Sequence, residues 1–157
     1  ATVDMALANT RARLRMTTLY YHAGLYGLLV AGTGNKVEDF GIGFYTKYGD
    51  GGVDLSPIAD LMKSEVYEIA RHLNIVESII KAAPSDGLFG DARSDEDQIG
   101  ASYPELEWAM QMKDAGKIPD DFEGRQKKVF EIYNRYNSSN KHKMIPIPVC
   151  EIPKDFK

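Results

Sequence analysis

A short loop with glycine, threonine and a nearby glutamate is the first part of the sequence that suggests chemistry. The apolar residues 28–31 run into Gly32-Thr33-Gly34, and Glu38 follows shortly after. Glycines leave backbone N–H groups open to a phosphate, a threonine hydroxyl adds a donor, and a carboxylate suits Mg²⁺. The spacing matches neither the G-x-G-x-x-G fingerprint nor the Walker A pattern. A nucleotide loop and an ordinary tight turn with a surface glutamate therefore both fit.

A second glycine-rich loop, YTKYGDGGVD at residues 45–54, carries Lys47, Asp50 and Asp54. A lysine suits a phosphate or carboxylate, and an aspartate suits ribose hydroxyls or a polar ring substituent. Asp50 is also followed by glycine, which makes a common turn dipeptide. Lys63 falls on the polar face of the next predicted helix, where a lysine is usually solvated. Two loops close together thus offer charged groups of both signs to an anionic ligand.

Helices and a strand are needed to position these loops, and the sequence predicts both. Residues 5–22 have good helix formers without Gly or Pro, and Gly24 would end that helix. Residues 25–31 read as a buried parallel strand, past whose carboxyl end ligands bind in open α/β sheets. A second helix is expected from Pro57, with an apolar stripe through Leu73. This pattern predicts an α/β fold, and the length fits one domain over 1–157.

The second half of the sequence predicts helices around an acidic segment. Short helix 76–83 precedes residues 85–107, where acidic side chains and glycines predict a long loop that serves as a connector or as a mobile cover. Helices are then expected at 104–115 and 122–137. Prolines after Met144 favour an extended tail.

Composition excludes several classes of function. The 157 residues are 43% hydrophobic, with a net charge of −4 and no long Lys/Arg run, which argues against nucleic acid as the main partner. No apolar stretch approaches a membrane span and no signal layout is present, so we expect a cytoplasmic protein. Cys150 is the single cysteine. An intramolecular disulfide and a thiolate metal cluster are therefore excluded, and we expect no side-chain nucleophile.

Motifs in a fixed order make the interpretation more specific. The segments GTGNKVE, FYTKYGDGGVDLSPIADLMKSEV, APSDGLFGDARSDEDQIGASY and HKMIPIP resemble the NAD synthetases over residues 9–148. These enzymes amidate deamido-NAD, nicotinic acid adenine dinucleotide, at the expense of ATP. The resemblance implies a Rossmann-like adenine-nucleotide-binding fold of the ATP pyrophosphatase type, with a parallel sheet flanked by helices. It also implies a homodimer.

Site residues follow from the resemblance position by position. On the ATP side, Thr33 matches a threonine that contacts ATP, Glu38 the glutamate that binds Mg²⁺, and Lys63 a phosphate-binding lysine. Ser85 stands where the family often has threonine. On the deamido-NAD side the matching residues are Arg13, Lys47, Asp54, His142 and Lys143, with Asp50 in the same loop. The acidic segment resembles the part that follows a mobile loop, which favours the cover.

The implied reaction holds two anionic nucleotides together. A carboxylate of the nicotinate ring attacks the α-phosphate of ATP to give an acyl-adenylate and pyrophosphate, and ammonia then displaces AMP. The first loop would serve ATP with Mg²⁺, and the second the dinucleotide. The nitrogen source, free ammonia or glutamine, stays open.

One family motif is missing from the sequence. Nothing resembles the pyrophosphatase loop Ser-Gly-Gly-x-Asp-Ser, which precedes this region in the family. We therefore expect the C-terminal portion of a catalytic domain, inactive or nearly so by itself. The segment 39–43 is also one residue longer than in some members. Two alternatives stay open, namely an inactive nucleotide-binding or dimerisation fragment, and a related ATP pyrophosphatase that acts on another carboxylate.

Overall fold

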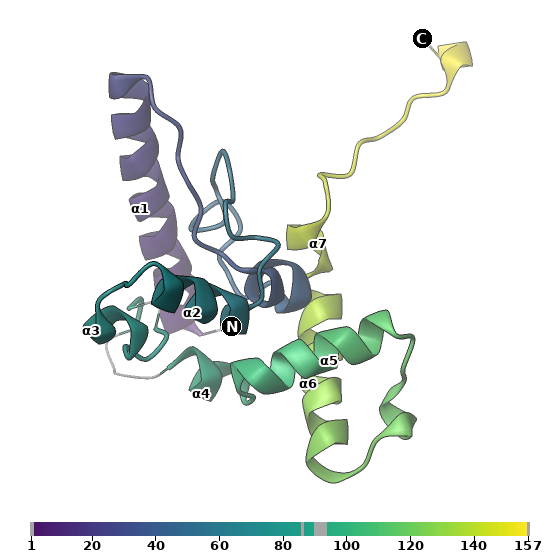
Figure 1. The fold of residues 1–157 in the computed structure, drawn as a ribbon. Helices are drawn as coiled ribbons and strands as arrows, with labels where there is room; N and C mark the ends of the chain where they lie inside the picture. Colours follow the sequence, from purple (N-terminus) through teal and green to yellow (C-terminus); the bar gives the residue numbers. More distant parts are fainter. Residues whose placement is uncertain (1, 86, 90–93, 157) are drawn as a thin grey trace.

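Helices are the regular elements of the part of the chain that the computed structural model describes, residues 2–85, 87–89 and 94–156 (Figure 1). In chain order they are α1 (Val3–Tyr26), the π-helix η1 (Lys36–Ile42), α2 (Lys63–His72), α3 (Glu77–Ile80), α4 (Asp95–Ile99), α5 (Tyr103–Asp114), the 3₁₀ turn η2 (Pro119–Asp121), α6 (Gly124–Ser139), α7 (Lys141–Met144) and the 3₁₀ turn η3 (Lys154–Phe156). Within those residues, no helix has both the length and the apolar composition of a membrane span.

The predicted parallel sheet is wrong for the described residues, and with it the Rossmann-like α/β class. They contain a parallel bridge between Ala31 and Leu55 but no strand. Gly32 N donates to Leu55 O at 2.7 Å, and the Val30 carbonyl accepts from residues 54 and 55. A parallel strand needs neighbours and covered faces, whereas Leu28 and Leu29 are 63% and 70% exposed. Because only one short segment lies beside it among the described residues, the apolar run 28–31 forms a single β-bridge and not a strand.

Helix boundaries agree with the sequence in the second half and differ in the first. Helices α5 and α6 lie within two residues of their predicted bounds, and α3 falls inside the predicted short helix. Helix α1 continues past Gly24 and ends at Gly27, whose φ of 65° gives the left-handed cap. Helix α2 begins at Lys63 instead of Pro57, because the Glu65 carboxylate accepts from Met62 N at 2.7 Å and caps the helix there.

The π-helix η1 lies in the main core, where it packs against both α5 and α6. Val37, Ile42, Leu106 and Phe130 are fully buried there. Asn35 begins the element by accepting from Glu38 N, and Gly43 ends it at a φ of 60°. A π-turn holds one residue more than an α-turn.

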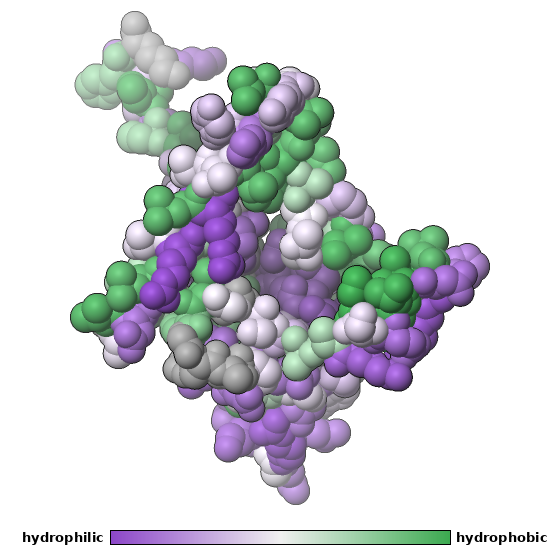
Figure 2. Space-filling model, turned by 90° about the vertical axis from the view of Figure 1, so that its left-hand side faces the viewer, coloured by the Kyte–Doolittle hydropathy of each residue, from purple (hydrophilic) through white to green (hydrophobic). Residues whose placement is uncertain are grey.

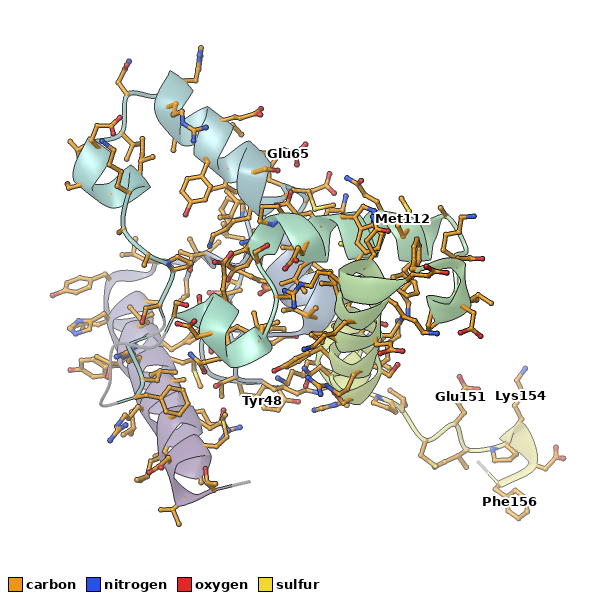
Figure 3. All side chains as sticks on the ribbon, turned by 90° about the horizontal axis from the view of Figure 1, so that it is seen from below. Tyr48, Glu65, Met112, Glu151, Lys154 and Phe156 are labelled. Atoms are coloured by element: carbon orange, nitrogen blue, oxygen red, sulfur yellow. The ribbon has the colours of Figure 1, made fainter. Side chains whose placement is uncertain are left out.

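Two parts of the chain pack loosely on this core. Helix α1 uses small side chains, Ala8 and Ala12, to contact Leu88 and Phe89, while most of its large apolar side chains are exposed. The tail after α7 is extended, as predicted, and its labelled residues lie away from the rest of the molecule in Figure 3. Both exposed segments contribute to the hydrophobic surface visible in Figure 2.

Candidate functional site

A cavity of about 460 Å³ lies where α1, the loop after η1, the segment around Leu88 and the junction of α6 and α7 meet. Its size suits a small organic ligand. Glu38, Asp50, Ser85 and Lys143 are the predicted site residues that line it. Figure 2 shows a hollow with hydrophilic side chains inside it. The structure thus brings residues from both ends of the chain to one cavity.

Glu38 and Lys63 form an ion pair at one edge of this cavity. Lys63 Nζ lies 2.8 Å from Glu38 Oε1, and the side chains are only 21% and 15% exposed. Glu38 belongs to the first turn of η1, and Lys63 is the first residue of α2. The two candidate ATP-side residues are therefore brought into contact from elements that are distant in sequence. The pair is partly removed from water. Its lysine suits a phosphate, and its carboxylate suits a metal ion.

Asp39 is a residue that the sequence analysis missed. Burial raises the pKa of its carboxyl to about 6, helped by the charges of Glu38 and Asp50. A Cβ on Gly34 would overlap this carboxylate. Gly34 is thus needed so that Asp39 can pack against the loop, in addition to any contact of the loop backbone with a ligand. The adjacent acidic pair Glu38-Asp39 was the sequence signal that could have identified it.

The predicted residues Arg13, Lys47 and Lys143 form a group of cations around the loop after η1, and Lys143 is the one of the three that lines the cavity. The predicted residue His142 accepts from this group through its backbone carbonyl. Arg13 Nε donates to Lys47 O at 3.3 Å, and Lys47 Nζ donates to His142 O at 2.5 Å. Lys143 Nζ donates to the carbonyls of Gly43 and Tyr45 at 2.8 and 2.6 Å. Carbonyl oxygens carry no net charge, so these contacts fix the cations without neutralising them. Such an arrangement suits an anionic ligand.

Lys143 is the most buried cation of this group. Desolvation lowers the pKa of its ammonium, while the nearby Asp50 carboxylate acts in the opposite direction. Its ammonium also lies 5.3 Å from the centre of the Tyr45 ring, and the Tyr45 hydroxyl donates to the Lys143 carbonyl. Tyr45 was not predicted, and it connects the loop after η1 to α7.

The remaining predicted residues lie outside the lining of the cavity. Thr33 is exposed in the loop before η1. Asp54 accepts hydrogen bonds from Val30 N at 2.8 Å and from the Tyr20 hydroxyl at 3.0 Å. Its carboxylate therefore holds the segment after α1 in place. For the predicted cover, residues 86 and 90–93 lie outside the described residues.

The donor set at Glu38 fits a magnesium ion only together with a phosphate ligand. The described residues contain no group of three or more His, Cys, Asp or Glu side chains placed to hold a metal. Mg²⁺ commonly takes one or two carboxylates and completes its shell with substrate phosphates and water. Glu38 meets that requirement.

Comparison with known proteins identifies the family of this chain. The family model of NAD synthase matches residues 1–146. The chain belongs to the NAD synthase family. Among its relatives in this family, the NH(3)-dependent NAD(+) synthetase of Picrophilus torridus is 45% identical over 152 residues, 95% of this chain and 57% of that protein. That of Carboxydothermus hydrogenoformans is 53% identical over 103 residues, 66% of this chain and 42% of that protein.

Solved structures of related synthetases share the fold. An NMN synthetase from Francisella tularensis superposes with a TM-score of 0.77 at 30% identity, covering 98% of this chain and 58% of that one. An NH3-dependent NAD synthetase from Campylobacter jejuni, in complex with nitrate, gives 0.70 at 27% identity, covering 96% and 57%. The chain thus spans about half the length of the NAD synthases it matches.

Proposed function

We propose that this chain serves the ATP-dependent amidation of deamido-NAD to NAD, with ammonia as the nitrogen donor. The observation that carries the proposal is the Glu38–Lys63 pair at 2.8 Å, at the edge of a cavity that Lys143 also lines, in a member of the NAD synthase family. The names of the curated relatives support ammonia as the donor.

In the proposed reaction, the nicotinate carboxylate displaces pyrophosphate from the α-phosphate of ATP, and ammonia then displaces AMP from the acyl-adenylate. Lys63 binds the phosphates of ATP, with Thr33 and Ser85 donating hydroxyls. Mg²⁺, when bound with ATP, neutralises phosphate charge, and Glu38 is the residue that would hold it. The charge of Lys63 is close to the leaving group, where negative charge develops.

The cation cluster binds the dinucleotide in this proposal. Arg13 donates to the Lys47 carbonyl and Lys47 to the His142 carbonyl, which holds the Arg13 and Lys47 side chains in place before the ligand arrives. A prearranged cluster loses less conformational entropy on binding than free side chains do. Asp50 and Asp54 lie in the same loop and would orient the ribose or the ring, with Lys143 beside them.

A homodimer in the cytoplasm is part of the proposal. The exposed apolar side chains of α1, Leu14 at 62% and Leu19 at 56% among them, support an interface on that helix. Light scattering of the protein after size-exclusion chromatography tests this, and a monomer at micromolar concentration would contradict it.

A second candidate is the same amidation on a mononucleotide. The structure from Francisella tularensis that covers 98% of this chain is named an NMN synthetase. The product of this second reaction, NMN, lacks the adenylate half of NAD. The two candidate substrates would therefore contact different parts of the cation cluster.

The deciding experiment uses the full-length gene product with ATP and Mg²⁺, and supplies deamido-NAD in one series and its mononucleotide counterpart in the other. Each series receives ammonium or glutamine, and chromatography quantifies NAD and NMN. NAD from deamido-NAD and ammonium is the expected result. NMN formation would favour the second candidate, and no product from a folded protein would favour an inactive nucleotide-binding fragment.

A further inference from the structure

Tyr103, the first residue of α5, contacts the Glu38–Lys63 pair although it belongs to neither predicted loop. Its side chain is 4% exposed. The Lys63 ammonium lies 4.7 Å from the centre of the Tyr103 ring. The hydroxyl of the same ring donates to Asp95 at 3.3 Å. Burial, followed by the charge of the nearby Glu38 carboxylate, raises the pKa of that hydroxyl. One aromatic side chain therefore contacts Lys63 and lies near Glu38.

The backbone of Tyr103 is itself held firmly. Its N–H donates to the Glu96 carboxylate at 2.7 Å, and the preceding residue is capped by Glu105 at 2.9 Å. Four residues further along α5, Glu107 accepts from Ser64 N and Ser64 Oγ at 2.9 and 2.7 Å. Helix α5 thus fixes the start of α2, where Lys63 lies, independently of Glu38.

The two partners of Lys63 respond differently to a ligand. A carboxylate neutralises the ammonium and competes with phosphate for it, so Glu38 must turn away when it binds a metal ion. A ring face attracts the cation through its quadrupole without neutralising it. The ring contact can therefore persist after Lys63 exchanges its carboxylate partner for a phosphate.

We propose that Tyr103 is a positioning residue, whose ring face keeps Lys63 in place when its ion pair with Glu38 opens to bind phosphate and Mg²⁺. This inference rests on the proposed function for the identity of the ligands. The contacts that carry it are present in the chain without a ligand, which allows a separate test.

The test compares Tyr103→Phe and Tyr103→Leu with the wild type in the full-length protein. Calorimetry measures the Kd of ATP at saturating Mg²⁺, and the Mg²⁺ concentration that half-saturates ATP binding. Tyr103→Leu removes the ring and should weaken ATP binding about fivefold, within the range of a partly desolvated cation–π contact. Tyr103→Phe keeps the ring, so it should bind ATP within about twofold of wild type and at a similar Mg²⁺ concentration.

Trp108→Leu is the matched control. Trp108 lies on the same helix and packs against Phe122 and Phe130, so its loss lowers stability without touching the ion pair. Two results would separate positioning from general packing. Tyr103→Phe should restore the ATP affinity that Tyr103→Leu loses, and the control should bind ATP with wild-type affinity. Wild-type ATP affinity in Tyr103→Leu would overturn the inference.

A ligand-free crystal structure of Tyr103→Leu distinguishes the inference from the proposed function. If the wild type does not bind ATP, the proposed function fails, and this structure still decides the role of Tyr103. A displaced Lys63 or Glu38 side chain supports the inference. An unchanged pair, with Lys63 ordered as in the wild type, overturns it.

Discussion

Individual charged residues at the site have partners that hold them without removing their charge. Lys47 and Lys143 donate to carbonyl oxygens. Both are thus fixed in space and still able to attract an anion. Lys63 has a carboxylate and an aromatic ring as partners, so it attracts a phosphate only after it exchanges the carboxylate.

Glu38→Gln is the first prediction at the residue scale. The amide keeps the size of the side chain but loses the charge that would bind Mg²⁺, so turnover of the full-length protein should fall at least about tenfold, in line with losses seen when metal sites are perturbed. Kinetics as a function of Mg²⁺ concentration measure it. Asp60→Asn is the control, because Asp60 forms an exposed pair with Lys36 and should have no effect. A wild-type rate for Glu38→Gln at every Mg²⁺ concentration would remove Glu38 from the metal site.

A second prediction concerns the stability of the fold as a function of pH. Arg125 donates to both carboxylate oxygens of Glu105 and lowers the pKa of that carboxyl from 4.5 to about 2. A lowered pKa stabilises the folded state above pH 4.5, and the stabilisation is lost as the pH falls toward 2. The pair is partly exposed, so solvent screening keeps its contribution small.

Urea unfolding of the wild type and of Arg125→Met checks this dependence. The wild type should be the more stable protein at pH 6, and the difference should shrink between pH 4.5 and pH 2. A difference that stays constant over this range would mean that the ion pair does not cause it.

At the scale of elements, the π-helix η1 decides where Glu38 lies. Its carbonyls at Gly41 and Ile42 accept from the side-chain amides of Asn137 and Asn140, both at 2.8 Å. The end of α6 thus fixes the element that carries Glu38. The close approach leaves no room for a side chain at Gly43, where a Cβ would lie 2.6 Å from Asn140 Cβ.

Gly43→Ala should therefore destabilise the protein by about 2–4 kcal/mol, since it combines a left-handed φ of 60° with overpacking. Gly27→Ala is the matched control. Its φ is 65° with nothing within 4 Å of the added Cβ, so it should cost only about 1–2 kcal/mol for the backbone. Denaturant unfolding of both variants measures the difference. Equal losses of stability would show that the contact between η1 and α7 tolerates a methyl group.

For the molecule as a whole, the cavity is formed by segments that meet only after folding, and the C-terminal tail does not take part in it. Val149 and Phe156 are both 82% exposed. Removal of residues 149–157 should change the melting temperature by less than about 2 °C, because few contacts are lost.

A cut after Ser139 is the contrasting variant. It also removes Asn140 and Lys143, which donate to Ile42 O and Gly43 O, and should lower the melting temperature by about 5 °C or more, the effect of roughly 2 kcal/mol in a domain of this size. Calorimetry of both truncations tests the prediction. A large fall in melting temperature after removal of residues 149–157 would contradict it.

The sequence predicted the helices that have their own periodic pattern and the residues that carry charge to the site. Helices α5 and α6 were predicted correctly because local spacing fixes their apolar faces. Membership of the NAD synthase family, inferred from separated motifs, is confirmed. The roles of Thr33, Ser85 and the other site residues, and the assignment of 1–157 to one domain, stay predictions.

Tertiary structure decided what local patterns do not contain. The apolar run at 28–31 has the composition of a buried strand, but whether it forms one depends on neighbours that lie elsewhere in the chain. The π-turn at η1, the burial of Asp39 and the place of Tyr103 beside Lys63 likewise depend on contacts between distant segments. Residue types set which charges are available for two anionic nucleotides, and long-range packing sets which of them meet.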